Sequence, residues 1–332
     1  MSGVPNNSKL LATSGMSTMD TDDGNGAKLK HHLYPNLNLL VDVKDLKSVK
    51  GKVGPKPTHL AFYPPRWKSF LREAKEECRV RHAIDKPFPS LANDLTKSLT
   101  NTLLAVQISW DQAGKESEAN IWPHHQADMA KLLYDDLSTW RYDLKKTAVA
   151  LAPAIYPLVP PSNIPSQERT AWVESAATEL LRISKFLCDG LDENGKTRNF
   201  ANPALSEAVI IFFYTGPYRV ARKRPEIFRK QVPLPCLALV AAAYNCVLDG
   251  LSKNGSGKWY PNFTAKEYGS IYACLLNLLK RIMENLYHGP KLTEQLESWA
   301  QAGWAASCNI DGHVDGGIDI ELLHPHLQIV LD

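Results

Sequence analysis

The sequence predicts an all-α fold: a single multi-helix bundle around a central hydrophobic helix, with extended N- and C-terminal arms. Three observations support this prediction. Apolar residues recur at spacings of three and four through most of the chain after Pro64 and Pro65. Helix-start signals precede several of these patterns, among them Asn202–Pro203 and the capping box Thr264–Glu267. The segment Leu237–Leu251 is apolar on nearly every side, which predicts burial at the centre of the bundle.

The helical patterns follow one another along the chain, and each has its own apolar stripe. The longest, from His124 to Leu151, directs Met129, Leu137 and Trp140 toward the core. Proline or a capping side chain starts many of the segments, and glycine ends several of them. In order, the stripes are Trp67–Cys78, Leu91–Trp110, Met129–Leu144, Trp172–Leu187, Ala204–Tyr214, Leu237–Leu251, Tyr268–Leu286 and Leu292–Trp299.

Composition divides the chain into a helical body and two flanking arms. Residues 1–30 are mostly Ser, Thr, Gly, Asn and Asp, which predicts a disordered tail, and residues 31–57 alternate weakly, as an extended arm would. Residues 58–306 form the predicted helical domain. Its proline-rich stretch 153–165 is a candidate joint between subdomains. Residues 307–332 contain Gly and Asp before a partly alternating segment, so we expect a C-terminal arm there.

The overall composition is that of a soluble protein. Hydrophobic residues make up 44% of the chain and the formal net charge is only +3, which argues against wholesale nucleic-acid binding. The six cysteines are far apart and none stands at zinc-ligand spacing, so we expect buried thiols in a reducing compartment. We find no signal peptide and read the apolar stretch Leu234–Leu251 as a core helix. We therefore expect an intracellular protein, cytoplasmic or nuclear, without a membrane partner.

One dense cluster of positive charge stands out in the sequence. It could hold an acidic protein partner or, as an alternative, a nucleic-acid backbone. It could equally be a solvated surface segment whose long side chains cover apolar atoms. The cluster consists of Arg219, Arg222, Lys223, Arg224, Arg229 and Lys230.

No motif nominates a catalytic residue, a metal or a cofactor. Asp135–Asp136 resembles a magnesium-binding aspartate pair, but a matching second set of ligands is absent, and a solvated helix face explains it better. Asp311–Gly316 begins like a calcium loop, yet Leu322 stands where the bidentate Glu belongs. The leading hypothesis is therefore a non-catalytic interaction or scaffold module that binds protein or, less directly supported, nucleic acid.

The second hypothesis is an enzyme or small-ligand-binding protein with an interior pocket lined by aromatic side chains. Such a pocket would lie near Asp136, Trp140 or Tyr214, with Arg219 beside it. A closed cavity with convergent polar groups at these residues would favour this hypothesis. A filled core with a flat basic surface would favour the first. The sequence does not indicate an oligomeric state.

Several segments follow one another in an order and spacing that resemble a known family. They are Phe62–Trp67, Leu132–Arg141, Asn199–Ala204, Phe212–Gly216, Leu237–Ala242 and Phe263–Tyr268. Together they resemble the basidiomycete-fungal domain of unknown function six-five-three-two, over roughly Pro55 to Trp304. The resemblance implies a mushroom-forming fungus as the source and supports the helical architecture, but it brings no catalytic residues.

Overall fold

A computed structural model describes residues 54–89, 95–115 and 121–315, and it confirms the all-α prediction. Its regular elements are helices, and one isolated antiparallel bridge joins Leu191 to Thr197. The predicted tail 1–30 and most of the predicted arm 31–57 lie outside the described residues. The elements are η1 (Leu60–Phe62), α1 (Pro65–Ile84), α2 (Leu95–Gln112), α3 (Gln126–Ile155), α4 (Arg169–Leu181), η2 (Arg182–Leu187), α5 (Pro203–Val209), η3 (Ile210–Thr215), η4 (Val220–Lys223), α6 (Pro225–Phe228), α7 (Leu234–Lys253), α8 (Ala265–Glu284) and α9 (His288–Asp315).

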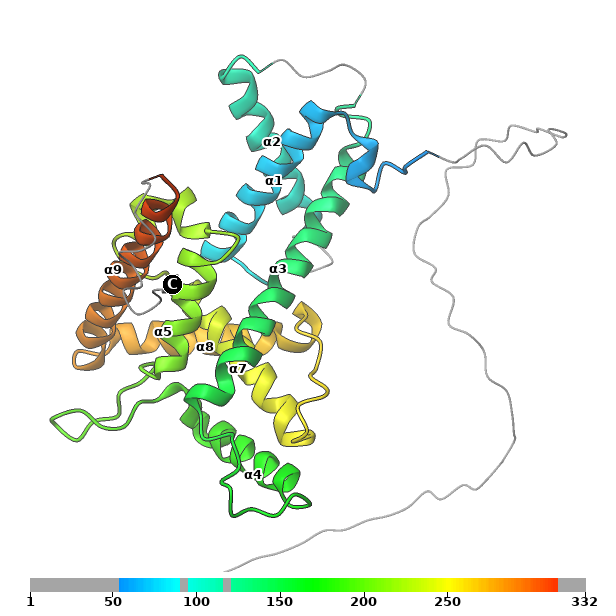
Figure 1. Cartoon of the computed structure of the whole chain (residues 1–332). Coiled ribbons are helices and arrows are strands. Elements are labelled where there is room, and N and C mark those ends of the chain that lie inside the picture. Colours follow the sequence, from blue (N-terminus) through cyan, green and yellow to red (C-terminus); the bar gives the residue numbers. More distant parts are fainter. Residues whose placement is uncertain (1–53, 90–94, 116–120, 316–332) are drawn as a thin grey trace, which may run out of the picture. The chain divides into compact units, whose positions relative to one another are not determined.

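Helix α7 is the centre of the bundle, as its composition predicts. It packs against α1, α3, α4, α5 and α8, and side chains on all its faces are buried (Figure 1). By length and composition alone α7 could cross a membrane, but most of it is buried inside the bundle. An apolar helix surrounded by other helices behaves as the core of a globular domain.

Helix α3 is the longest helix of the unit and connects its two ends (Figure 1). At about 1.5 Å per residue it spans about 45 Å. It contacts the α1–α2 pair as well as α5 and α7. Pro153 lies in its last turn, so the first part of the predicted joint 153–165 is helical and not extended.

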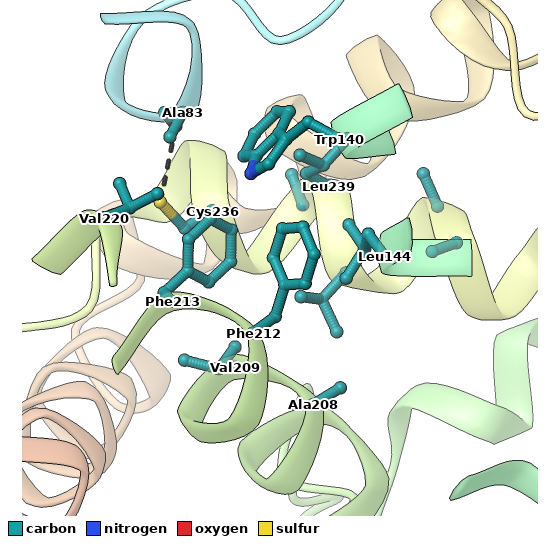
Figure 2. Close-up of a cluster of buried hydrophobic side chains, with 14 of the residues drawn as sticks. Ala83, Trp140, Leu144, Ala208, Val209, Phe212, Phe213, Val220, Cys236 and Leu239 are labelled. Carbon is teal, nitrogen blue, oxygen red and sulfur yellow. Dashed lines mark hydrogen bonds between the residues drawn. The ribbon is translucent and has the colours of Figure 1, made fainter. Parts of the chain in front are cut away.

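An aromatic cluster fills the space between α3, the π-helical segment η3 and α7 (Figure 2). The ring of Trp140 lies 5.4 Å from that of Phe212, which lies 5.2 Å from that of Phe213. Cys236 of α7 donates its thiol hydrogen to the carbonyl of Ala83, at 3.3 Å between sulfur and oxygen. This bond fastens the end of α1 to α7.

The C-terminal boundary predicted at residue 306 is wrong for residues 307–315. They continue α9, which ends at Asp315. The side chain of Arg222 donates to the hydroxyl of Ser307 at 2.8 Å and to its carbonyl at 2.7 Å. These bonds hold the helix beyond the predicted boundary, so the glycine and aspartate that follow do not end it there. The remainder of the predicted arm lies outside the described residues.

A buried histidine lies between α1 and α2. The Nδ1–H of His82 donates to the carbonyl of Cys78 at 2.8 Å, and the hydroxyl of Ser98 donates to Nε2 at 3.3 Å. The sulfur of Cys78 is 3.6 Å from Nδ1. Burial lowers the pKa of His82 and raises that of the Cys78 thiol, so both groups are neutral. The pair is therefore a packed contact and not a thiolate–imidazolium nucleophile.

Two helical glycines differ sharply in the space around them. A Cβ at Gly303 of α9 would lie 2.7 Å from the Tyr214 ring, whereas one at Gly269 of α8 would meet its nearest atom at 4.0 Å. Alanine favours a helix over glycine by about 1 kcal/mol. At Gly303 the clash outweighs this gain, because the Tyr214 ring is fully buried and cannot move freely.

We therefore expect Gly303→Ala to lower the free energy of unfolding by about 1–3 kcal/mol. Gly269→Ala should raise it by about 0.5–1 kcal/mol, since only helix propensity changes there. Urea unfolding followed by circular dichroism measures both. Equal effects of the two substitutions would contradict the close packing of α9 on Tyr214.

The buried histidine makes folding pH-dependent. Because the unfolded chain takes up a proton near the ordinary pKa of 6.5 and the folded chain at a lower pKa, His82 stabilises the fold above pH 6.5. That stability is lost as the pH falls toward the folded pKa. His82→Gln should flatten the stability profile between about pH 7 and about pH 5, whereas His59→Gln, an exposed histidine, should leave it unchanged. A His82→Gln profile parallel to that of the wild type would refute the assignment.

Candidate functional site

The predicted basic cluster lies in η4 and in the residues that flank η4 and α6, and most of its charge is used within the fold. Lys223 pairs with Glu76 of α1 at 2.6 Å, and Arg224 pairs with Glu77 at 2.7 Å. Both carboxylates belong to the face of α1 beside η4. These contacts dock the segment on α1.

The same cluster also contacts α9. Arg222 holds Ser307, and the guanidinium of Arg229 lies over the ring of Trp304 at 4.2 Å from the centroid. Arg219 is half-buried and has a left-handed backbone, with φ of 43°, while Lys230 is exposed. The cluster thus joins α1 to α9, and the dense charge has a structural use that spacing in the sequence does not reveal.

The three predicted pocket residues do not line a common cavity. Asp136 pairs with Arg79 and, at 3.6 Å, with Lys75, so α1 neutralises it. Trp140 is fully buried in the aromatic cluster (Figure 2). Tyr214 is also fully buried and donates its hydroxyl to the carbonyl of Phe228 at 2.9 Å. These residues belong to the core and to the α1–α3 contact.

A cavity of about 390 Å³ opens instead on the other face of α3, beside the first turn of α8. We call it the cationic pocket. Three of its lining residues carry positive charge and none carries negative charge. The lining residues are Pro89, Tyr134, Ser138, Arg141, Tyr142, Lys145, Asn262, Phe263, Thr264, Ala265 and Lys266.

Arg141 and Lys145, one helical turn apart on α3, are the central feature of the cationic pocket. They are only 6% and 7% exposed. Neither has a carboxylate within ion-pair distance in the described part of the chain. Arg141 donates from Nη1 to the carbonyl of Pro87 at 3.0 Å, and Lys145 donates to the carbonyl of Pro261 at 2.9 Å. Their close hydrogen bonds thus go to backbone oxygens, the ring of Phe88 lies 5.6 Å from Arg141 and that of Tyr142 5.3 Å from Lys145, and no described carboxylate compensates either charge.

Arg141 keeps an unused donor. Its Nε is buried and has no hydrogen-bond partner, while Nη2 makes only a long bond of 3.4 Å to Ser138. Burial lowers the pKa of this guanidinium, which is the expected effect of desolvating a charge that lacks a counter-ion. A buried charge and an unpaired buried donor both cost free energy, and an anion in the pocket would relieve both.

The first turn of α8 adds positive potential on the opposite wall. The hydroxyl of Thr264 caps the amide of Glu267 at 3.4 Å, as the capping box predicts. The amides of Ala265 and Lys266 precede the first intrahelical bond, and no described residue accepts from them. The helix dipole places partial positive charge at this end. Two side-chain cations and a helix N-terminus therefore converge on one cavity, which is the arrangement that binds an anion.

A larger cavity of about 770 Å³ lies between the 189–198 hairpin and α9. Both of its lining cations, Lys291 and Arg198, are paired with carboxylates within the fold. Lys291 pairs with Asp192 at 3.0 Å and with Glu193 at 2.7 Å, and Arg198 pairs with Asp189 at 2.6 Å. This cavity lacks the uncompensated charge of the cationic pocket. Among residues 54–89, 95–115 and 121–315, no three His, Cys, Asp or Glu side chains gather as a metal site would require.

Sequence reasoning did not identify Arg141 and Lys145 as site residues, although the signal was present. They follow Leu137 at spacings of four and eight, on the same stripe as Leu144 and Ala148. A charge within an apolar stripe is unusual, because solvated charges normally occupy the opposite face. Two such charges at adjacent turns would have identified this face of α3 as a candidate binding site.

Comparison with known proteins finds a match to one family. Residues 73–282 match the family described as "Domain of unknown function (DUF6532)". No curated protein and no solved structure matches the chain significantly. The match covers more than half of the chain, begins within α1, ends within the last turn of α8 and includes every described residue that lines the cationic pocket. The chain therefore belongs to the DUF6532 family.

Proposed function

We propose that this protein is a non-catalytic binding module that takes an anionic group in the cationic pocket. The observation that supports it is the buried pair Arg141 and Lys145, which has no carboxylate partner among the described residues. Proteins seldom bury a charge without pairing it, because desolvation costs several kcal/mol. A site that does so is stabilised when a negative ligand enters.

The lining chemistry favours binding over catalysis. The described lining residues include Arg, Lys, Tyr, Ser, Thr and Asn but no His, Cys, Asp or Glu, and the buried amine of Lys145 is already bonded to the carbonyl of Pro261. Arginine stays protonated in proteins and supplies donors without taking up a proton. The groups present can hold and orient an anion, and the pocket volume admits a small organic molecule attached to it.

The role expected for residues 219–230 stays a prediction. Binding of a protein partner, or of nucleic acid, would have to use charges that α1 and α9 already contact. An intracellular location also stays a prediction. Both are compatible with an anion-binding module, whose ligand could be a free small molecule or a group on a larger one.

Inorganic phosphate is the simplest probe of the pocket. At about 100 times its dissociation constant it should add about 2.7 kcal/mol to the stability of the wild type, measured as a rise in Tm at low salt. Lys145→Met should abolish this rise. Without phosphate this variant should be as stable as the wild type or more so, because relief of an uncompensated charge offsets the bond lost at Pro261.

Lys146→Met is the matched control. Lys146 follows Lys145 directly, but its side chain is exposed and pairs with Asp143, so the phosphate response should persist. Sulfate and small carboxylates extend the test to other anions. If none of these anions raises the Tm of the wild type more than that of Lys145→Met, the proposed function is wrong.

A further inference from the structure

A second positively charged cavity adjoins the cationic pocket. It has a volume of about 580 Å³ and lies between the end of α1 and the start of α2. Pro89 lines both cavities, so they share this wall residue. We call the second cavity the α1–α2 cavity. Its lining residues are Val80, Arg81, His82, Ile84, Asp85, Lys86, Pro89, Lys97, Ser98, Asn101 and Arg224.

Positive charge exceeds negative charge in the α1–α2 cavity. Arg81 and Arg224 share a single carboxylate, that of Glu77, at 2.6 Å and 2.7 Å. Lys97 is exposed and makes no ion pair with a described residue. Asp85 is the one acidic residue among the described residues of the lining. This excess of positive charge resembles that of the cationic pocket, although the charged side chains here are more exposed.

His82 shows that the two sets of charges lie close together. After burial, which is the main cause of its lowered pKa, the guanidiniums of Arg141 and Arg81 each lower it further. Arg141 belongs to the cationic pocket and Arg81 to the α1–α2 cavity. One side chain is therefore within electrostatic reach of both, and Arg141 also contacts the carbonyl of Pro87, two residues before the shared Pro89.

We propose, building on the proposed function, that the ligand is a compact polyanion that occupies both cavities. One anionic group binds Arg141, Lys145 and the first turn of α8. A second binds near Lys97, beside Arg81 and Arg224. The ligand class that fits is a polyphosphorylated small molecule. Its first phosphoryl group is small enough to reach buried cations, which the backbone of a nucleic-acid duplex cannot do.

Isothermal titration of the full chain at low salt with phosphate, pyrophosphate and tripolyphosphate tests this proposal. The wild type should bind tripolyphosphate at least about ten-fold more tightly than phosphate, because a second group gains its own contacts. Lys97→Met should remove most of that gain and leave the affinity for phosphate unchanged. Lys280→Met is the control, since Lys280 is an exposed lysine of α8 about 20 Å along the helix from the pocket.

The outcomes separate this inference from the proposed function. The polyanion is overturned if the wild type binds phosphate but binds tripolyphosphate no more tightly. It is also overturned if Lys97→Met still binds tripolyphosphate more tightly than phosphate. Both outcomes leave the anion-binding module intact. A single-stranded oligonucleotide that binds more tightly than tripolyphosphate also overturns it, in favour of nucleic acid. Absence of binding to every anion overturns both. If Lys97→Met loses the tighter binding of tripolyphosphate while Lys280→Met keeps it, the result supports the polyanion.

Discussion

The described helices are arranged around the need to bury α7 on every side. Its residues from Cys236 to Leu248 are almost continuously buried, so no face of it can remain at the surface. Helices α3, α4, α5 and α8 cover it, and the Cys236 thiol ties it to the end of α1. A helix that needs neighbours on every side fixes the positions of those neighbours, and it thereby places α3 and α8, which form the walls of the cationic pocket.

The cationic pocket follows from this arrangement. Helices α3 and α8 both pack on α7, and the loop before α8 brings Pro261 over Lys145. The carbonyl of Pro87, at the other rim, meets Arg141. The carbonyl that solvates Arg141 comes from the loop after α1, and the one that solvates Lys145 comes from the loop before α8. Both cations also line the cavity. An interior hydrogen bond of this kind stabilises the cation without cancelling its charge.

Much of the fold is readable in the sequence, because it depends on local patterns. The all-round apolar character of Leu237–Leu251 and the caps at Asn202 and Thr264 predict elements that the structure confirms. Prolines mislead about where a helix ends when they lie in its first or last turn. Pro153 lies in the last turn of α3, and Pro290 lies in the first turn of α9, where the missing amide has no intrahelical acceptor to lose.

The site depends on contacts between distant residues, and these are hidden from periodicity. Arg141 meets a carbonyl 54 residues away, and Lys145 meets one 116 residues away. Likewise, part of the dense charge at residues 219–230 pairs with α1, although Arg224 and Glu77 are 147 residues apart in the sequence. Residue type and spacing predict that a charge exists. Only the folded chain determines whether an internal carboxylate, a carbonyl or nothing stands opposite it.

The buried cations of α3 also have a consequence while the chain is being made. Helix α3 leaves the ribosome before residues 234–284, which form α7 and α8 and will cover it. During that interval its core-facing stripe is exposed to water, and an uninterrupted apolar stripe would favour self-association. Arg141 and Lys145 interrupt the stripe with positive charge. The two residues to which we assign anion binding would therefore also oppose self-association of the half-made chain.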